Sequence, residues 1–175
     1  MIHTFVAYVE NKPGVLNRVS SLFRRRAYNI ESLAVGPAHL PGISRMTIEV
    51  EAATEDIAHQ IAANLYKLVD VLHVDDLTNR KSVKRALALV KIDTSNPQVR
   101  SEIIQIASIF KQAEIVDAAP SSLILEIVGY EDTVERFIRM LEPYRILEMQ
   151  RTGVVGMLRG SEPVSEGLAA LEEQQ

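Results

Sequence analysis

The chain has 175 residues, with 19 basic and 23 acidic side chains and therefore a net charge of -4. This balance argues against a generic polyanion binder, because phosphate backbones are bound by an excess of Lys and Arg. The absence of cysteine excludes disulfides, a thiolate nucleophile and thiolate-bound metals, and favours a reducing cytoplasmic location. No window has the apolar length of a signal peptide or membrane span, so we expect a soluble, cytoplasmic protein.

The first 77 residues predict the order βαββαβ. Residues 2–9 are rich in β-branched and aromatic side chains, and a turn at 10–14 leads into a helix with apolar residues at helical spacing. Residues 29–35 indicate a second strand. A third strand is predicted around residues 46–50. There Met46, Ile48 and Val50 alternate with polar residues, which predicts that one face of this strand is solvated.

A second helix and a closing strand complete this unit. Thr54 is a suitable N-cap for a helix whose apolar residues continue to Leu68, and residues 71–77 are apolar enough for a strand. Residues 78–82 are polar and mark a short boundary. We therefore predict a first domain at residues 1–78.

The same order repeats after the boundary, which predicts a second domain at 83–160. A strand at 86–92 precedes a helix opened by Asn96 and Pro97. A hairpin, a helix and a final strand follow, at 115–128, 134–141 and 144–149. The predicted fold class is α+β, with two consecutive ferredoxin-like βαββαβ sandwiches. The acidic tail, 161–175, is expected to be frayed, with a marginal helix at 168–171.

In such a sandwich both helices cover one sheet face and leave the other bare. A bare apolar face in so small a domain is a surface that a partner can bury. The sequence therefore predicts dimerisation through the sheet face or a sheet edge. The residues expected on that patch are Phe5, Val6, Tyr8, Ile48 or Val50.

The turn between the first strand and the first helix is the best candidate for a binding site. Asn11 ends the strand, and Pro13 and Gly14 allow a tight turn into a helix whose first amides, at Val15 and Leu16, have no intrahelical acceptor. Such a helix N-terminus suits a small carboxylate, and the Asn11 side chain can bind an ammonium or a carboxylate. The alternative is an ordinary turn in which Asn11 bonds its own backbone.

A second polar position, Asn29, lies where the first helix gives way to the second strand. It is either a C-terminal cap residue or part of a binding site. The strand that follows is an edge strand in this topology. If two chains pair through these edges, Asn29 of one approaches the turn after Asn11 of the other, and a ligand can be shared across the two-fold axis.

Other polar features indicate no catalytic or metal centre. The cations Arg24 to Arg26 fit a helix end and a solvated face, although a nucleic-acid or partner contact is an alternative. The four histidines, His3, His39, His59 and His73, have no ligand-like spacing. Nucleophile elbows, phosphate loops and dinucleotide fingerprints are absent from the sequence, so we expect neither catalytic residues nor a metal site.

Six segments, taken in order, carry a resemblance to one family. They are Glu10 to Leu16, Tyr28 to Leu33, Ser44 to Ile48, Lys67 to Val71, Leu89 to Ile92, and Arg151 to Gly160. On these segments the first 77 residues resemble an ACT domain, the small amino-acid-binding module, and the chain to about residue 160 is similar to the regulatory small subunit of acetolactate (acetohydroxyacid) synthase.

The resemblance implies a non-catalytic subunit that activates a separate catalytic subunit, which condenses two 2-oxo acids in valine, leucine and isoleucine biosynthesis. Thiamine diphosphate, Mg and FAD are then expected on that partner and no cofactor on this chain. It also implies feedback inhibition by valine or another branched-chain amino acid, without membrane or nucleic-acid partners. By motif position the effector site comprises Asn11, Gly14, Val15 and Leu16 of one chain with Asn29 and Ile30 of its dimer mate. Leu16, Ile30 or Val35 would contact the aliphatic side chain of the bound amino acid.

One residue departs from the family pattern. Ala27, just after the first helix, stands where the family usually has Gly, a position at which a left-handed backbone is easy for Gly and strained for Ala. Either the helix ends differently or strain is accepted beside Asn29. The Ala27→Gly variant is expected to be more stable or to bind the effector more tightly.

Two other classes of function fit the sequence less well. A ferredoxin-like RNA-binding module needs exposed aromatic residues and a basic rim, whereas the chain has five Tyr, four Phe, no Trp and balanced charge. A stand-alone enzyme or metal chaperone lacks support because cysteine and acid–base clusters are missing. The segment Gly153 to Gly160 is either a contact for the catalytic subunit or a terminal strand and turn.

Overall fold

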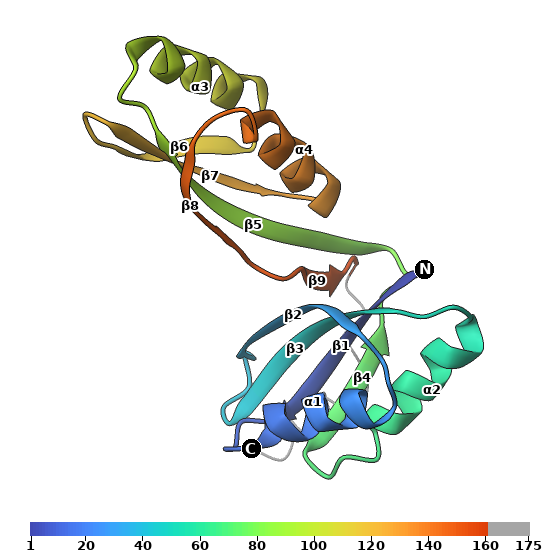
Figure 1. Ribbon diagram of the computed structural model, residues 1–175. Coiled ribbons are helices and arrows are strands. Elements are labelled where there is room, and N and C mark those ends of the chain that lie inside the picture. Colours follow the sequence, from blue (N-terminus) through green and yellow to red (C-terminus); the bar gives the residue numbers. More distant parts are fainter. Residues whose placement is uncertain (161–175) are drawn as a thin grey trace. The chain divides into compact units, whose positions relative to one another are not determined.

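The computed structural model describes residues 1–160, which form two compact units (Figure 1). The first unit comprises Met1–Val83 together with the described residues from Val154 onward, and the second comprises Lys84–Gly153. The predicted second domain ran to residue 160, whereas residues 154–160 pack with the first unit. The predicted tail, 161–175, with its helix at 168–171, lies outside the described residues.

The first unit contains one antiparallel sheet in the strand order β2-β3-β1-β4, with both helices on one face (Figure 1). This arrangement confirms the predicted ferredoxin-like βαββαβ fold. Its elements are β1 Ile2–Glu10, α1 Val15–Arg25, β2 Ile30–Pro37, β3 Ile43–Glu51, α2 Glu55–Leu65 and β4 Val71–Asp76.

Both helices begin where the apolar spacing and caps predict them, but α2 ends at Leu65, so Leu68, which the prediction placed in this helix, lies beyond it. In α1, Val15, Val19 and Phe23 are buried, one turn apart on the face that meets the sheet. The backbone N–H of Ile57 donates to the Thr54 hydroxyl (3.3 Å), which confirms Thr54 as the N-cap of α2. The helices cover a core that includes Phe5, Ile48 and Val50 from the middle of the sheet.

The opposite sheet face is covered, so the predicted bare apolar patch is wrong. Phe5, Ile48 and Val50 face the helices, while Val6 and Tyr8 lie on the other face, only 0% and 3% exposed. A second apolar cluster covers that face, and it contains Val6, Tyr8, Leu40, Ile43 and Leu77 with Leu158 packed against it.

The predicted solvated face of β3 is also wrong, for the same reason. Thr47 and Glu49, which alternate with the core residues, are 2% and 5% exposed. Glu49 accepts a hydrogen bond from the Thr4 hydroxyl (3.2 Å), which partly compensates for burying its carboxylate. With the face closed, a partner of this sheet must use an edge.

The second unit repeats the topology, with the strand order β6-β7-β5-β8. Alternate residues of β5, from Ala86 to Ile92, are buried beneath the helices, as expected for a sheet with one covered face. The Asn96 side chain accepts the N–H of Gln98 (2.9 Å) and caps the first helix, as predicted. The elements are β5 Ser82–Asp93, α3 Pro97–Ile109, β6 Ala113–Ala118, β7 Ser122–Gly129, α4 Glu131–Leu141 and β8 Ile146–Arg151.

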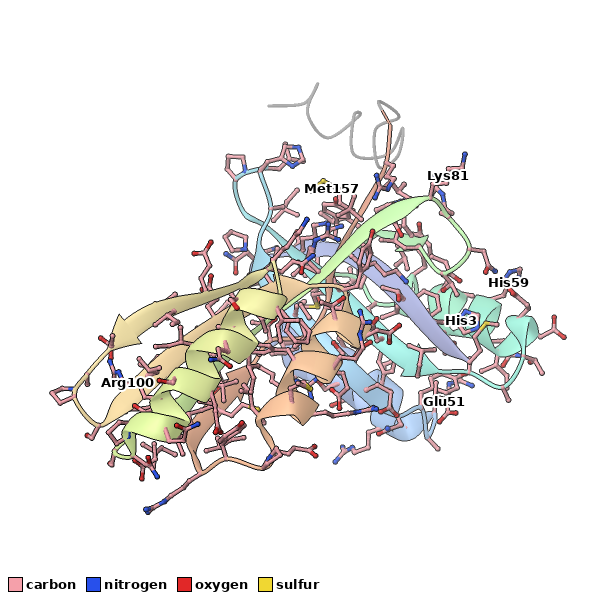
Figure 2. The ribbon with its side chains drawn as sticks, turned by 90° about the horizontal axis from the view of Figure 1, so that it is seen from above. His3, Glu51, His59, Lys81, Arg100 and Met157 are labelled. Atoms are coloured by element: carbon pink, nitrogen blue, oxygen red, sulfur yellow. The ribbon has the colours of Figure 1, made fainter. Side chains whose placement is uncertain are left out.

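The segment after β8 returns to the first unit. It forms the short strand β9, Val155–Leu158, which pairs with β5. The N–H of Val154 donates to the Ser32 hydroxyl (3.0 Å) on β2, and the Arg45 guanidinium donates to the carbonyl of Gly156. Met157 is 62% exposed (Figure 2). The strand alternative for residues 153–160 is thereby confirmed. No helix in the described part of the chain is long and apolar enough to cross a membrane.

Candidate effector site

The turn after β1 is held by two backbone hydrogen bonds. The N–H of Asn11 donates to the carbonyl of Gly42 (2.8 Å), and the N–H of Glu10 donates to the carbonyl of Asp70 (2.9 Å). Gly14 is the N-cap residue of α1, with φ +86°, a left-handed conformation that favours glycine. These contacts fix the end of β1 and leave the Asn11 side chain exposed.

The first turn of α1 presents free donors. The N–H of Val15 donates to the carbonyl of Lys12 (3.3 Å), but the amides of Leu16 and Asn17 have no acceptor among residues 1–160. The first turn contains no acidic side chain, and Gly14 provides no side-chain cap. The helix dipole is therefore uncompensated there, and an anionic group is favoured next to these amides.

Two ion pairs support this loop. The Arg18 guanidinium binds the buried Asp70 carboxylate at 2.6 Å and 3.0 Å and joins α1 to the segment before β4. A Cβ at Gly14 would lie 4.0 Å from an Arg18 nitrogen and nothing nearer, so backbone conformation rather than space requires glycine. Lys12 pairs with Glu10 at 2.7 Å on the surface. The sequence pattern indicates no role in this loop for Arg18, Gly42 or Asp70, although Asp70 lies in the family-like segment Lys67 to Val71.

The end of α1 adopts a Schellman motif, with Ala27 where glycine is usual. Ala27 has φ +55°, the one non-glycine residue with positive φ among residues 1–160. The N–H of Tyr28 donates to Phe23 (3.0 Å) and that of Ala27 to Arg24 (3.2 Å), and the rings of Phe23 and Tyr28 lie edge to face at 6.1 Å. Of the two predicted alternatives, the structure therefore shows accepted strain. Asn29 follows directly and is exposed, with its amide donating to Glu31.

Within one chain the two halves of the predicted site lie at opposite ends of the sheet. Ile30 is opposite Val50 on β3, which is opposite His3 at the start of β1. Asn11 follows Glu10, at the other end of β1. The seven residue steps along β1 from His3 to Glu10 span about 23 Å, so Asn11 and Ile30 lie at least that far apart along the strand direction. The chain therefore cannot bring Asn11 and Asn29 to one small ligand by itself.

The two sheet edges differ. On β4, the Tyr66 hydroxyl accepts the N–H of Val74 (3.0 Å) and donates to its carbonyl (3.1 Å), so the outward backbone groups of this residue, in the middle of the edge, are occupied. On β2 no backbone group from 30 to 37 has a partner other than β3 within residues 1–160. The β2 edge is thus the open one, and open edges are where strands of another chain add.

The open edge also presents aliphatic side chains. Ile30 and Val35 are paired with Val50 and Met46 of the core, so both point to the helix side of the sheet. Val35 is 46% exposed and Ile30 is partly exposed, and Leu16 at the start of α1 is 45% exposed. Of these side chains, Leu16 and Val35 lie toward the end of the sheet where α1 begins and can contact a small apolar group near its exposed amides, whereas Ile30 of the same chain lies at the other end.

The remaining polar features form no second site. No group of three or more potential metal ligands occurs in the part of the chain that the structure describes. His3 is buried on β1, whereas His59 is exposed on α2 (Figure 2). Arg24 to Arg26 are exposed at the C-terminal end of α1, where cations are favoured by the helix dipole.

The fold and the glycine turn define the first unit as an ACT domain, and the comparisons agree. Residues 5–73 match the model of the acetohydroxyacid synthase (AHAS) small subunit-like ACT domain, and residues 85–160 match that of the small subunit of acetolactate synthase. The chain belongs to the family of acetolactate synthase small subunits.

Individual relatives cover nearly the whole chain. A probable acetolactate synthase small subunit from Archaeoglobus fulgidus is 45% identical over 161 residues, 92% of this chain and 99% of the relative. The acetolactate synthase small subunit of Bacillus subtilis is 41% identical over 154 residues, 88% of each chain. The crystal structure of the small subunit from Thermotoga maritima superposes with a TM-score of 0.84 at 36% identity, covering 93% of this chain and 99% of that one.

Proposed function

We propose that this chain is a dimeric, non-catalytic regulatory subunit that activates the catalytic subunit of acetolactate synthase and inhibits it when a branched-chain amino acid is bound. The family membership supports a regulatory role and a large-subunit partner. Thiamine diphosphate, Mg and FAD would belong to that partner. A cytoplasmic location follows from the same proposal.

The observation that supports this most is the separation of the two half-sites along one sheet with an open β2 edge. Antiparallel pairing of two β2 strands would place Ile30 of one chain beside Pro37 of the other. Pro37 is opposite Ser44, which is opposite Val9. The mate's Asn29 and Ile30 would then lie at the same end of the sheet as the turn after β1, and each dimer would have two composite sites.

In that site each group has a defined task. The amides of Leu16 and Asn17 would bind the effector carboxylate at the N-terminus of α1. The Asn11 and Asn29 carbonyl oxygens would accept hydrogen bonds from the ammonium. Leu16 with Ile30 or Val35 would contact the aliphatic side chain. The Asn29 side-chain N–H donates to Glu31, which leaves the carbonyl oxygen of the same side chain available to the ammonium.

Inhibition would be a coupling between the shared site and the catalytic subunit. An effector that bridges two chains gains binding energy only from dimer arrangements that close the site, so it favours those arrangements. Within the first unit the edge strand β2 also bonds the returning segment, since the Ser32 hydroxyl accepts the N–H of Val154. A coupling of about 1–3 kcal/mol suffices for partial inhibition.

Calorimetric titration with valine, leucine and isoleucine, followed by assay with the purified catalytic subunit, tests this function. Asn11→Ala should weaken binding about 10- to 150-fold, the loss expected when hydrogen bonds to a charged group are removed. Asn79→Ala, an exposed asparagine far along the chain that bonds Glu55, is the matched control and should bind normally. Failure to stimulate the catalytic subunit would overturn the proposal.

The RNA-binding alternative has little structural support. Tyr8, the aromatic residue on the non-helical face of the first sheet, is 3% exposed and thus unavailable for stacking on bases. On that face it is covered by Leu40 and Ile43. Nanomolar RNA binding without stimulation of the catalytic subunit would reverse this ranking.

A further inference from the structure

The turn between β1 and α1 is held at both ends by one connected set of contacts. The N–H of Glu10, at the end of β1, donates to the carbonyl of Asp70 (2.9 Å). The Asp70 carboxylate binds the Arg18 guanidinium, with Nη2 donating to Oδ1 at 3.0 Å and Nε lying 2.6 Å from Oδ2. The N–H of Arg18 donates to the carbonyl of Gly14 (3.0 Å). These four residues form a clamp around residues 11–13.

Asp70 is the centre of the clamp. Its side chain is only 7% exposed, and its carbonyl and its carboxylate bind different elements, β1 and α1. The other carboxylate of the loop, that of Glu10, binds Lys12 (2.7 Å), so Arg18 pairs with Asp70 alone. Burying a charge costs free energy that the attraction only partly returns, so such a pair adds little net stability. Its contribution is a fixed distance between the end of β1 and the start of α1.

Arg18 acts on the turn and not on the effector itself. Successive residues of an α-helix are about 100° apart, so Arg18 and Leu16 point to opposite flanks of α1. Leu16 is the side chain expected to contact the aliphatic part of the effector, whereas Arg18 binds Asp70. The proposed effector groups lie at the two ends of the clamped turn, because Asn11 follows the end of β1 and the free amides begin at Leu16. The clamp therefore sets the distance between them.

We infer that Asp70 and Arg18 are positioning residues of the effector site, which hold Asn11 and the amides of α1 at the separation that the ammonium and carboxylate of one amino acid require. The inference rests on the proposed function and adds to it the residues that preorganise the site. Without the pair, the turn has to be ordered when the amino acid binds, and this cost lowers the affinity. A loss of about tenfold is expected, as for the ordering of one or two side chains.

The test is calorimetric titration of the full-length chain with valine, leucine and isoleucine, alone and with the catalytic subunit. Arg18→Met and Asp70→Leu should each raise the dissociation constant about tenfold, and the double variant no further, because each change opens the same clamp. Arg18→Lys keeps a cation beside Asp70 and should bind more tightly than Arg18→Met. Arg80→Met is the matched control, since Arg80 and Asp75 are a similar pair, 45% and 11% exposed, and it should bind within about twofold of the wild type.

Urea unfolding of the same variants separates positioning from a general structural role. Arg18→Met leaves a buried carboxylate unpaired, and adding Asp70→Leu removes it, so the double variant should be more stable than Arg18→Met while its affinity stays low.

The outcomes also separate the inference from the function on which it rests. An affinity that recovers together with the stability, an equal loss in Arg80→Met, or wild-type affinity in Arg18→Met and Asp70→Leu would each overturn the inference and leave the proposed function standing. A wild type that binds none of the three amino acids, alone or with the catalytic subunit, would overturn the proposed feedback inhibition and the inference with it.

Discussion

The strained helix end at Ala27 provides a prediction whose sign can be worked out. A left-handed conformation costs a non-glycine residue roughly 1–2 kcal/mol, and Ala27 has φ +55°. Ala27→Gly removes that strain but gives the unfolded chain extra freedom, worth about 0.4–1 kcal/mol. The net expectation is a stabilisation of about 0.5–1 kcal/mol, with effector binding unchanged or tighter because Asn29 lies only two residues after Ala27.

Urea unfolding of the full-length chain measures this difference, provided that the free energy of unfolding falls with urea concentration at the same slope in both proteins. Ala63→Gly is the matched control, since Ala63 is exposed inside helix α2 and its replacement should cost about 0.5–1 kcal/mol. The two substitutions should therefore shift the midpoint in opposite directions. A loss of stability in Ala27→Gly similar to that in Ala63→Gly, together with weaker effector binding, would refute the left-handed assignment.

Three further predictions follow from single contacts. Arg18→Met leaves the buried Asp70 carboxylate unpaired and should lower the free energy of unfolding by about 1–3 kcal/mol; an unchanged urea midpoint would contradict the pairing. Tyr66→Phe leaves the outward N–H and carbonyl of Val74 without the Tyr66 hydroxyl, and it should lower the free energy of unfolding by about 0.5–1.5 kcal/mol. Urea unfolding measures this loss, and an unchanged free energy would contradict a stabilising role of the hydroxyl at this edge. Hydrogen bonds from the Ser95 hydroxyl and N–H lower the pKa of Asp93 below its ordinary 3.8, with Arg145 adding to the effect. This stabilisation is present above pH 3.8 and fades as pH falls through the depressed pKa; Ser95→Ala should move the pKa towards 3.8 in an NMR titration, and an unmoved value would exclude the contact.

Local patterns were sufficient to predict the elements and their order. Helical spacing from Val15 to Phe23 and the caps Thr54 and Asn96 are signals read within a few residues. They predict α1, α2 and α3 where the structure has them. Taken in order, these signals predict βαββαβ twice. Few folds accommodate that order, so it also predicts the fold class.

Long-range contacts account for what the sequence could not show. The alternation in β3 is typical of a half-solvated strand, yet Thr47 is buried beneath a face that Leu40 and Leu158 help to cover. Leu158 follows in the chain more than a hundred residues later, so no local signal predicts its place. Arg18 finds Asp70 at a separation of 52 residues, for the same reason.

The candidate site was predicted in its parts rather than its assembly. Pro13 and Gly14 indicate the turn, and the structure adds the left-handed Gly14 and the unpaired amides beyond it. That Asn11 and Asn29 must come from different chains depends on strand register, which follows from the complete sheet. The residue pattern offered this only as one possibility.

A mixing experiment tests the shared effector site most directly. Asn11→Ala and Asn29→Ala homodimers should each bind valine about 10- to 150-fold more weakly than the wild type, because every composite site lacks one partner. Unfolding and refolding the two variants together in equal amounts gives half heterodimers, each with one intact and one doubly altered site, so about a quarter of the wild-type sites should return at wild-type affinity. No recovery in the mixture, with both variants folded, would contradict a site built from two chains.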